Sequence, residues 1–146
     1  MHILDKMPWI RTHIALYKSD PAKAHYFQSP GVDSPKPTLL LTTTGCKSGE
    51  KRDVALIYGK CPTGFAVVGS LGGSPKHPSW YVNLQAHPEA EIQVGVDHYH
   101  VRARLTEGAE RATLLAELTK ILPNYADYEK KTQGIREMPV VVLEVQ

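Results

Sequence analysis

The sequence predicts a compact, mainly antiparallel β-barrel of six strands with a few peripheral helices, which is an α+β fold. Six short runs are rich in β-branched and aromatic residues, and most of them have local connections. The regular alternation of strands and helices that parallel crossovers require is missing. The chain has 146 residues, of which 42% are hydrophobic, and this suits one domain with a substantial core.

The first 37 residues are expected to form a helix and a linker. Five apolar residues recur at helical spacing and predict a helix over 8–17; they are Ile3, Met7, Ile10, Ile14 and Tyr17. We expect this helix to cap the barrel, with a lid or a peripheral membrane contact as the alternative. The Pro-rich stretch 29–37 is typical of a linker. The barrel domain is therefore predicted to span residues 38–146.

The predicted strands are 38–44, 54–58, 65–68, 91–96, 98–105 and 139–145. The first three are expected to form a meander, because short turns separate them. In the fourth and fifth, apolar residues alternate with polar ones up to Val96 and Leu105. This alternation indicates one buried and one solvated face for each strand.

Two helices are predicted between the strands. A short one opens at Pro78 and ends before His87, and a longer one spans about 109–122. In the longer helix, Leu115 and Leu118 have the spacing of a stripe that faces the core.

Composition excludes several classes of partner. A net charge of only +2 gives no general argument for nucleic acid or an anionic membrane. Only two cysteines occur and no leader segment is evident, so we expect no disulfide framework and a cytoplasmic location. No apolar run approaches the roughly 20 residues that a membrane-spanning helix needs. His98 and His100 share one strand face without a third ligand, so we expect solvated side chains and no metal site.

The first candidate site is a glycine-bracketed turn between two predicted strands, over residues 45–52. It carries the hydroxyl of Ser48 and three basic side chains, Lys47, Lys51 and Arg52. Backbone N–H groups, the hydroxyl and these cations can converge on one anion, as in a phosphate cradle. The glycine spacing is not that of a Walker loop, and an ordinary basic turn with solvated lysines remains the alternative.

The second candidate site is the loop 70–78, which follows a strand and opens the short helix. It contains Gly72, Gly73, Ser74 and Pro75, followed by Lys76. Lys76 precedes a helix start, where free N–H groups favour an anion. Paired glycines also let a flat ring lie close to the backbone.

These segments resemble the deazaflavin (F420)-dependent nitroreductase and quinone reductase family, whose fold is a split β-barrel related to the FMN-binding pyridoxamine oxidases. The resemblance rests on T-T-T-G-C-K-S-G-E-K-R at 42–52, G-G-S-P-K-H-P-S-W-Y-V-N-L at 72–84 and H-P-E-A-E-I-Q-V-G at 87–95. It covers roughly residue 38 to the C-terminus. It implies an F420-dependent oxidoreductase that passes a hydride to a quinone, a nitro compound or an activated enone.

The resemblance also implies roles for individual residues. Lys47 and Arg52 would hold the phosphate and acidic tail of the coenzyme, and Lys76 would add a third cation. The deazaflavin ring would be lined by Gly72, Gly73, Ser74 and Pro78, with Trp80 packing beside it. Pro75 and Ser48 are also expected to bind the cofactor. The sequence departs from the family at Cys46, where the family usually has Arg; Lys51 is the expected substitute for the missing charge.

The main task of the protein is to hold the cofactor and the acceptor in the right position, because the cofactor itself carries out the difficult step, the hydride transfer. Tyr125 and Tyr128 are three residues apart and share a face if that segment is helical. We expect one of them, or Ser74, to donate a hydrogen bond to the acceptor oxygen that gains charge; the alternative is that both tyrosines only pack.

Two alternative functions remain open from the sequence. An FMN-dependent reductase of the wider split-barrel group would need to bind one phosphate, whereas the four cations at Lys47, Lys51, Arg52 and Lys76 favour the longer anionic tail of F420. A non-catalytic carrier of a flavin, F420 or a lipid is the other alternative. The expected partner is a small-molecule electron acceptor, and an oligomer is compatible with the sequence.

Overall fold

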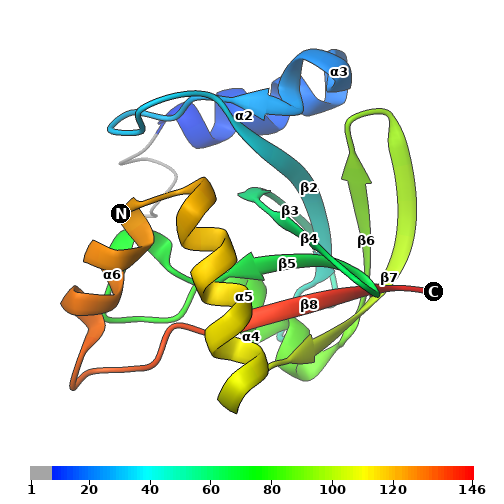
Figure 1. Ribbon diagram of the computed structural model, residues 1–146. Coiled ribbons are helices and arrows are strands. Elements are labelled where there is room, and N and C mark those ends of the chain that lie inside the picture. Colours follow the sequence, from blue (N-terminus) through cyan, green and yellow to red (C-terminus); the bar gives the residue numbers. More distant parts are fainter. Residues whose placement is uncertain (1–7) are drawn as a thin grey trace.

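The structure, a computed structural model, describes residues 8–146, and its centre is an antiparallel sheet that curls into a half-barrel (Figure 1). The strands are β1 Tyr26–Phe27, β2 Lys36–Thr44, β3 Lys51–Ile57, β4 Gly59–Cys61, β5 Gly64–Val68, β6 Glu89–Val94, β7 Asp97–Leu105 and β8 Val140–Val145. The helices are α2 Pro8–Ser19, α3 Pro21–Ala24, the short 3-10 turn η1 Leu71–Gly73, α4 Ser79–Ala86, α5 Gly108–Ile121 and α6 Asn124–Thr132. The expected apolar positions Ile3 and Met7 lie outside the described residues.

The mainly antiparallel fold is confirmed, and each of the six predicted strands is present. The strand order is β1-β2-β6-β7-β8-β5-β4, and β3 pairs with β2. Two short strands were not predicted, β1 and β4, because two or three residues carry no readable alternation. The domain boundary predicted after residue 37 falls inside β2, to which β1 also pairs.

The predicted three-stranded meander is wrong. β2 and β3 form a hairpin, but β5 pairs with β4 and β8 and has no ladder with β3. After Tyr58 the chain forms the separate strand β4, whose tight turn back to β5 leaves β5 free to pair with the C-terminal strand.

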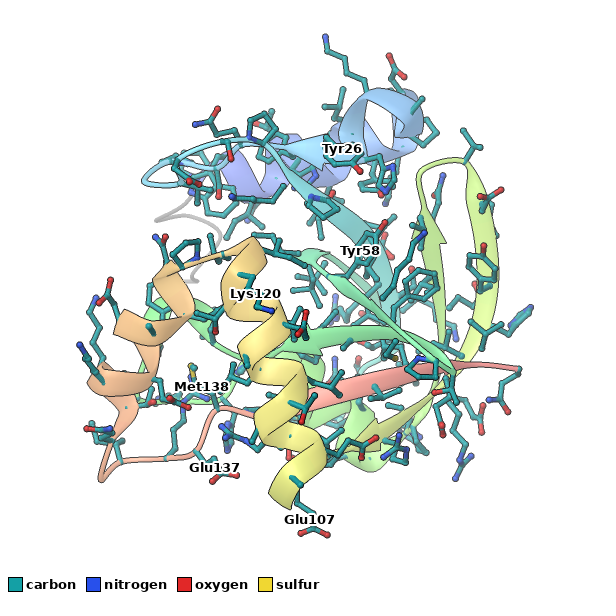
Figure 2. All side chains as sticks on the ribbon, viewed as in Figure 1. Tyr26, Tyr58, Glu107, Lys120, Glu137 and Met138 are labelled. Carbon is teal, nitrogen blue, oxygen red and sulfur yellow. The ribbon has the colours of Figure 1, made fainter. Side chains whose placement is uncertain are left out.

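The core lies on both sides of the sheet. Inside the curl, residues of β2, β5, β6 and β8 pack with Trp80 and Leu84 of α4. On the other side, α5 and α6 cover β5 and β8, and Met138 lies beside these helices (Figure 2). Val96 and Leu105 are exposed, contrary to the predicted alternation, because they stand at the turn after β6 and at the last position of β7.

The N-terminal helix α2 packs over β2 and β3 (Figure 1). The hydroxyl of Tyr17, which is fully buried, donates to the Thr38 carbonyl at 2.6 Å and accepts the Gly95 N–H at 3.1 Å. Nε2 of buried His13 lies 3.1 Å from the Ala24 carbonyl oxygen. A buried polar group without a partner lowers the stability of the fold. These hydrogen bonds therefore fix the position of α2, in addition to its apolar packing. No helix in the described part of the chain is long and apolar enough to cross a membrane.

Candidate functional site

The basic turn between β2 and β3 is closed by its own backbone. The Gly45 N–H donates to the Glu50 carbonyl at 2.8 Å, and the Gly49 N–H donates to the Gly45 carbonyl at 2.9 Å. The Ser48 hydroxyl oxygen accepts the Glu50 N–H at 3.1 Å. A side chain at position 45 would meet the Ser48 hydroxyl at 2.7 Å and the Glu50 carbonyl oxygen at 3.2 Å, so it would displace the Ser48 hydroxyl and crowd the turn. The turn is therefore a fixed platform for the side chains that it carries.

The four predicted cations fall into two groups. Lys51 donates to the Thr44 hydroxyl at 3.3 Å, and Arg52 forms an ion pair with Glu50 at 3.1 Å. The ammonium groups of Lys47 and Lys76 have no hydrogen-bond or ion-pair partner within residues 8–146. Two exposed and unengaged cations are thus present, one in each candidate loop.

Asn83 binds the first candidate loop to α4, the helix that follows the second. Its amide is buried, accepts the Cys46 N–H at 3.0 Å and donates to the Thr43 hydroxyl at 3.1 Å. Because α4 begins directly after the loop that carries Lys76, the turn that carries Cys46 and Lys47 is bound to the helix that follows the second loop. That the two loops face one ligand stays a prediction.

The second loop contains three consecutive residues in the left-handed region. Their φ values are +42° at Leu71, +64° at Gly72 and +82° at Gly73. A side chain at Gly73 would meet Cδ of Lys131 at 2.9 Å and Cα of Tyr128 at 3.3 Å, both on α6. A side chain at Gly72 would meet nothing within 4 Å. Gly73 is thus required by the packing of α6, and Gly72 presents bare backbone to open space.

The remaining predicted residues of the second loop and of α4 differ in how far they are buried. The Ser74 hydroxyl accepts the Lys76 N–H at 3.3 Å, while Pro75 is exposed. Pro78 is buried at the start of α4, which has no side-chain cap. The indole of Trp80 is only 6% exposed and packs in the core, so a contact with a bound ring stays a prediction.

Tyr125 and Tyr128 lie on α6 with ring centroids 6.3 Å apart, as expected for a helical segment. Tyr125 is buried against α5 and β8, and burial raises the pKa of its phenol. Tyr128 is half-buried and its backbone contacts the glycine loop at Gly73. The structure therefore places Tyr128, and not Tyr125, next to this loop.

Arg136 holds the second candidate loop and was missed by the sequence analysis. Its guanidinium donates to the carbonyl oxygens of Gly69, Ser70 and Ser74, each at 2.9 Å. No local pattern identifies it, because its partners are 62 to 67 residues away in the sequence.

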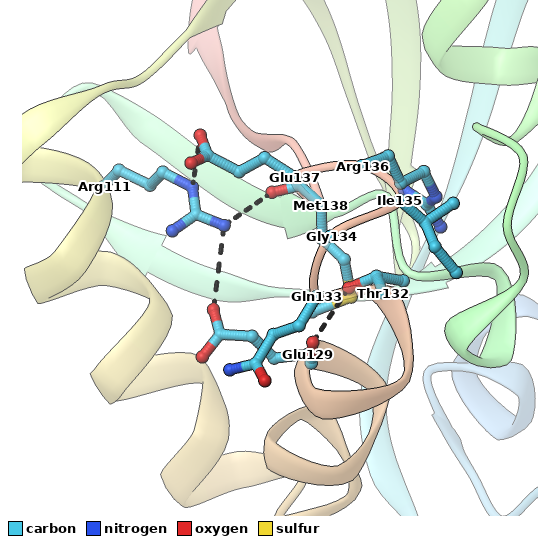
Figure 3. A pocket seen from close by; sticks show the side chains of 9 residues that line it. All are labelled: Arg111, Glu129, Thr132, Gln133, Gly134, Ile135, Arg136, Glu137 and Met138. Carbon is cyan, nitrogen blue, oxygen red and sulfur yellow. Dashed lines mark hydrogen bonds and ion pairs between the residues drawn. The ribbon is translucent and has the colours of Figure 1, made fainter.

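A cleft of about 510 Å³ adjoins the loop on the side of Arg136. Its lining comes from α5, α6 and the segment before β8 (Figure 3). Arg111 donates to the Met138 carbonyl at 2.9 Å there and lies near the carboxylates of Glu129 and Glu137. Gly72, Gly73 and the four predicted cations do not line this cleft. Among residues 8–146 no group of three His, Cys, Asp or Glu side chains is arranged to hold a metal ion.

Comparisons with known proteins show similar sequences and similar structures. The family described as F420H(2)-dependent quinone reductase matches residues 9–145. An F420H(2)-dependent quinone reductase of Mycobacterium tuberculosis is 34% identical over 137 residues, which cover 92% of this chain and 88% of the relative.

Two solved structures are similar as well. A structure described as an F420-H2 dependent reductase, FDR-A, is 42% identical with a TM-score of 0.68, and the match covers 74% of this chain and 94% of that one. A structure described as a domain-swapped dimer is 36% identical with a TM-score of 0.69, and the match covers 92% and 94% of the two chains.

Proposed function

Because this chain belongs to the F420H(2)-dependent quinone reductase family, we propose that it uses reduced coenzyme F420 to reduce a quinone, a nitro compound or an activated enone. The observation that carries this proposal is that Asn83 of α4, the helix opened by the loop with one unengaged lysine, binds the turn that carries the other. F420 joins a flat ring to a long anionic tail, so its site needs bare backbone beside spaced cations.

The residues present fit such a coenzyme. Lys47 and Lys76 are the free cations for the tail, and Lys51 and Arg52 add charge on the strand that follows the first turn. Gly72 has the open backbone that a flat ring requires. Cys46 contributes its backbone N–H to Asn83, so this position holds the turn in place and supplies no charge of its own.

The side chains then have to position the acceptor and stabilise charge on it. When bound, reduced F420 supplies the hydride. Tyr128 is our first choice as the donor to the acceptor oxygen, since it is half-buried beside Gly73, and Ser74 is the second. Tyr125 is expected to support Tyr128 by packing against its ring.

Titration of the protein with F420 and with FMN, followed by a quinone with each reduced cofactor, tests the proposal. We expect binding of F420 and reduction of the quinone. Preferential binding and turnover of FMN would favour the FMN-dependent alternative, and F420 binding without turnover would favour the carrier.

Lys47→Ala tests the placement of the tail. Loss of one charged hydrogen bond of roughly 1.5 to 3 kcal/mol should raise the F420 dissociation constant by about ten- to a hundred-fold. The variant should also show a weaker dependence of this constant on salt. Lys60→Ala is the matched control, because Lys60 is an exposed lysine on β4, outside both loops. Equal constants for the two variants would show that the tail lies elsewhere.

Tyr128→Phe and Tyr125→Phe separate the two tyrosines. We expect kcat to fall with Tyr128→Phe and to change little with Tyr125→Phe, and unchanged turnover in both would discard a role for the phenols. We further propose a cytoplasmic location, to be checked by cell fractionation, and an oligomer, to be checked by sedimentation. The relative described as a domain-swapped dimer supports the second of these.

A further inference from the structure

The guanidinium of Arg136 brackets the left-handed part of the glycine loop. Its bonds to the carbonyls of Gly69 and Ser70 lie before the run of Leu71, Gly72 and Gly73, and its bond to Ser74 lies after it. Leu71 is a non-glycine residue with positive φ, which is a strained conformation that persists only when its surroundings enforce it. Arg136 is the side chain that reaches both ends of this strained run.

Arg136 also sets the hydrogen-bonding state of His77. Nη1 of Arg136 lies 3.1 Å from Nδ1 of His77. Since a guanidinium can only donate, Nδ1 has to be the acceptor, and the proton of the neutral imidazole is then on Nε2. Burial, and then the charge of Arg136, lower the pKa of His77 from its usual value of 6.5, in keeping with a neutral ring.

The donors of Arg136 are nearly all in use. Nε bonds one carbonyl, Nη1 bonds one carbonyl and His77, and Nη2 bonds one carbonyl, so four of about five N–H groups have partners. A guanidinium engaged in this way holds the loop and has few free N–H groups for a ligand. Its planar fork is essential to the arrangement, because an ammonium cannot match several fixed carbonyls at once.

We propose that Arg136 is a positioning residue of the reductase site: it holds the loop 69–77 in its binding conformation and fixes His77 as an uncharged Nε2–H donor at the exposed end of that loop. The expected consequence, tight binding of the coenzyme, rests on the proposed function. The contacts with the loop and with His77 are a property of the protein without ligand.

The test compares Arg136→Gln and Arg136→Lys with Arg111→Gln. Arg111 is the matched control, because it also donates to a backbone carbonyl of the 133–139 segment, whereas its ion-pair partners are Glu129 and Glu137 and not residues of the loop. We expect Arg136→Gln to raise the F420 dissociation constant about ten-fold or more and to lower kcat. Arg136→Lys should resemble Arg136→Gln, the salt dependence of binding should keep its slope, and Arg111→Gln should stay within about three-fold of the wild type.

Recovery of wild-type affinity by Arg136→Lys would overturn the proposal, because charge alone would then suffice. Unchanged affinity in Arg136→Gln would overturn it too. A second measurement uses the protein without coenzyme: nitrogen-15 NMR of the His77 ring should show the proton on Nε2 in the wild type and mixed tautomers in Arg136→Gln. A wild-type proton on Nδ1 would reject the inference even if the variants do not fold.

The two proposals fail differently. If the wild-type protein does not bind F420, the proposed function is wrong, and the NMR result, with hydrogen exchange of the amides in 70–77, still decides whether Arg136 holds the loop. If the wild type binds F420 and Arg136→Gln binds it equally well, only the role of Arg136 is wrong.

Discussion

Gly72 and Gly73 are adjacent in one left-handed run, but a methyl group added at each would meet different surroundings. At Gly72 the added carbon would stand in open space, and at Gly73 it would meet Lys131 at 2.9 Å and the backbone of Tyr128 at 3.3 Å. Comparison of Gly72→Ala with Gly73→Ala therefore separates the free-energy cost of a left-handed backbone from the cost of packing against α6. The same comparison separates an effect on the stability of the fold from an effect on ligand binding.

The expected magnitudes follow from these contacts. A left-handed residue with a side chain costs about 1 to 2 kcal/mol, and this is the whole cost expected for Gly72→Ala. At Gly73 the end of the Lys131 side chain can move aside, but the backbone of α6 cannot, so overpacking adds about 1 to 3 kcal/mol. Gly108→Ala is the control, because Gly108 has φ +60° and also faces open space, at the start of α5.

Urea denaturation followed by tryptophan fluorescence measures the free energy of unfolding of the three variants. Equal losses at Gly72 and Gly73 would refute the contact with α6. Titration with F420 measures the other consequence: Gly72→Ala should weaken binding about ten-fold or more, and Gly108→Ala should not. Wild-type affinity in Gly72→Ala would show that no ring lies on this bare backbone.

Two further predictions concern buried polar groups. Asn83→Ala leaves the Cys46 N–H and the Thr43 hydroxyl without their partner. We therefore expect a loss of about 1 to 3 kcal/mol in the free energy of unfolding and faster hydrogen exchange of the Cys46 amide. Unchanged exchange at Cys46 would mean that Asn83 does not hold the basic turn. Burial lowers the pKa of His13 from 6.5, against the opposing effect of its bond to Ala24. The unfolded chain then binds more protons than the folded chain below about pH 6.5, so stability should fall as the pH drops through this range, by at most about 1.4 kcal/mol per pH unit. His13→Gln should flatten this dependence, and an equal slope in both proteins would place its origin elsewhere.

Much of the fold could be predicted because the longer strands of the sheet have readable patterns. The alternation in β6 and β7 and the apolar run of β8 locate these strands without any tertiary information. The pairing of β5 with β8 could not be predicted, because it joins segments about half the chain apart and depends on how the sheet curls. The exposed Val96 shows the same limit, since the turn overrides the alternation there.

The two candidate loops could be predicted because glycines and lysines are grouped within a few residues in each. The side chains that hold the loops could not be assigned, because their partners are distant in sequence. Asn83 bonds to residues 37 and 40 positions earlier, and Arg136 is 59 to 67 positions from its partners in the loop. The residues that we predict to face a ligand thus have a local signal, whereas the groups that hold these loops are recognised only in three dimensions.

The hydroxyl of Tyr17 has one more consequence. It connects α2 to the backbone of β2 and to the turn after β6 at a single oxygen atom. Movement of α2 away from the sheet would have to break both bonds together, so gradual fraying from the helix start cannot release the whole helix. We expect opening on this side of the molecule to be an all-or-none event, in which the amide of Gly95 exchanges with solvent at the same rate as the amides of α2.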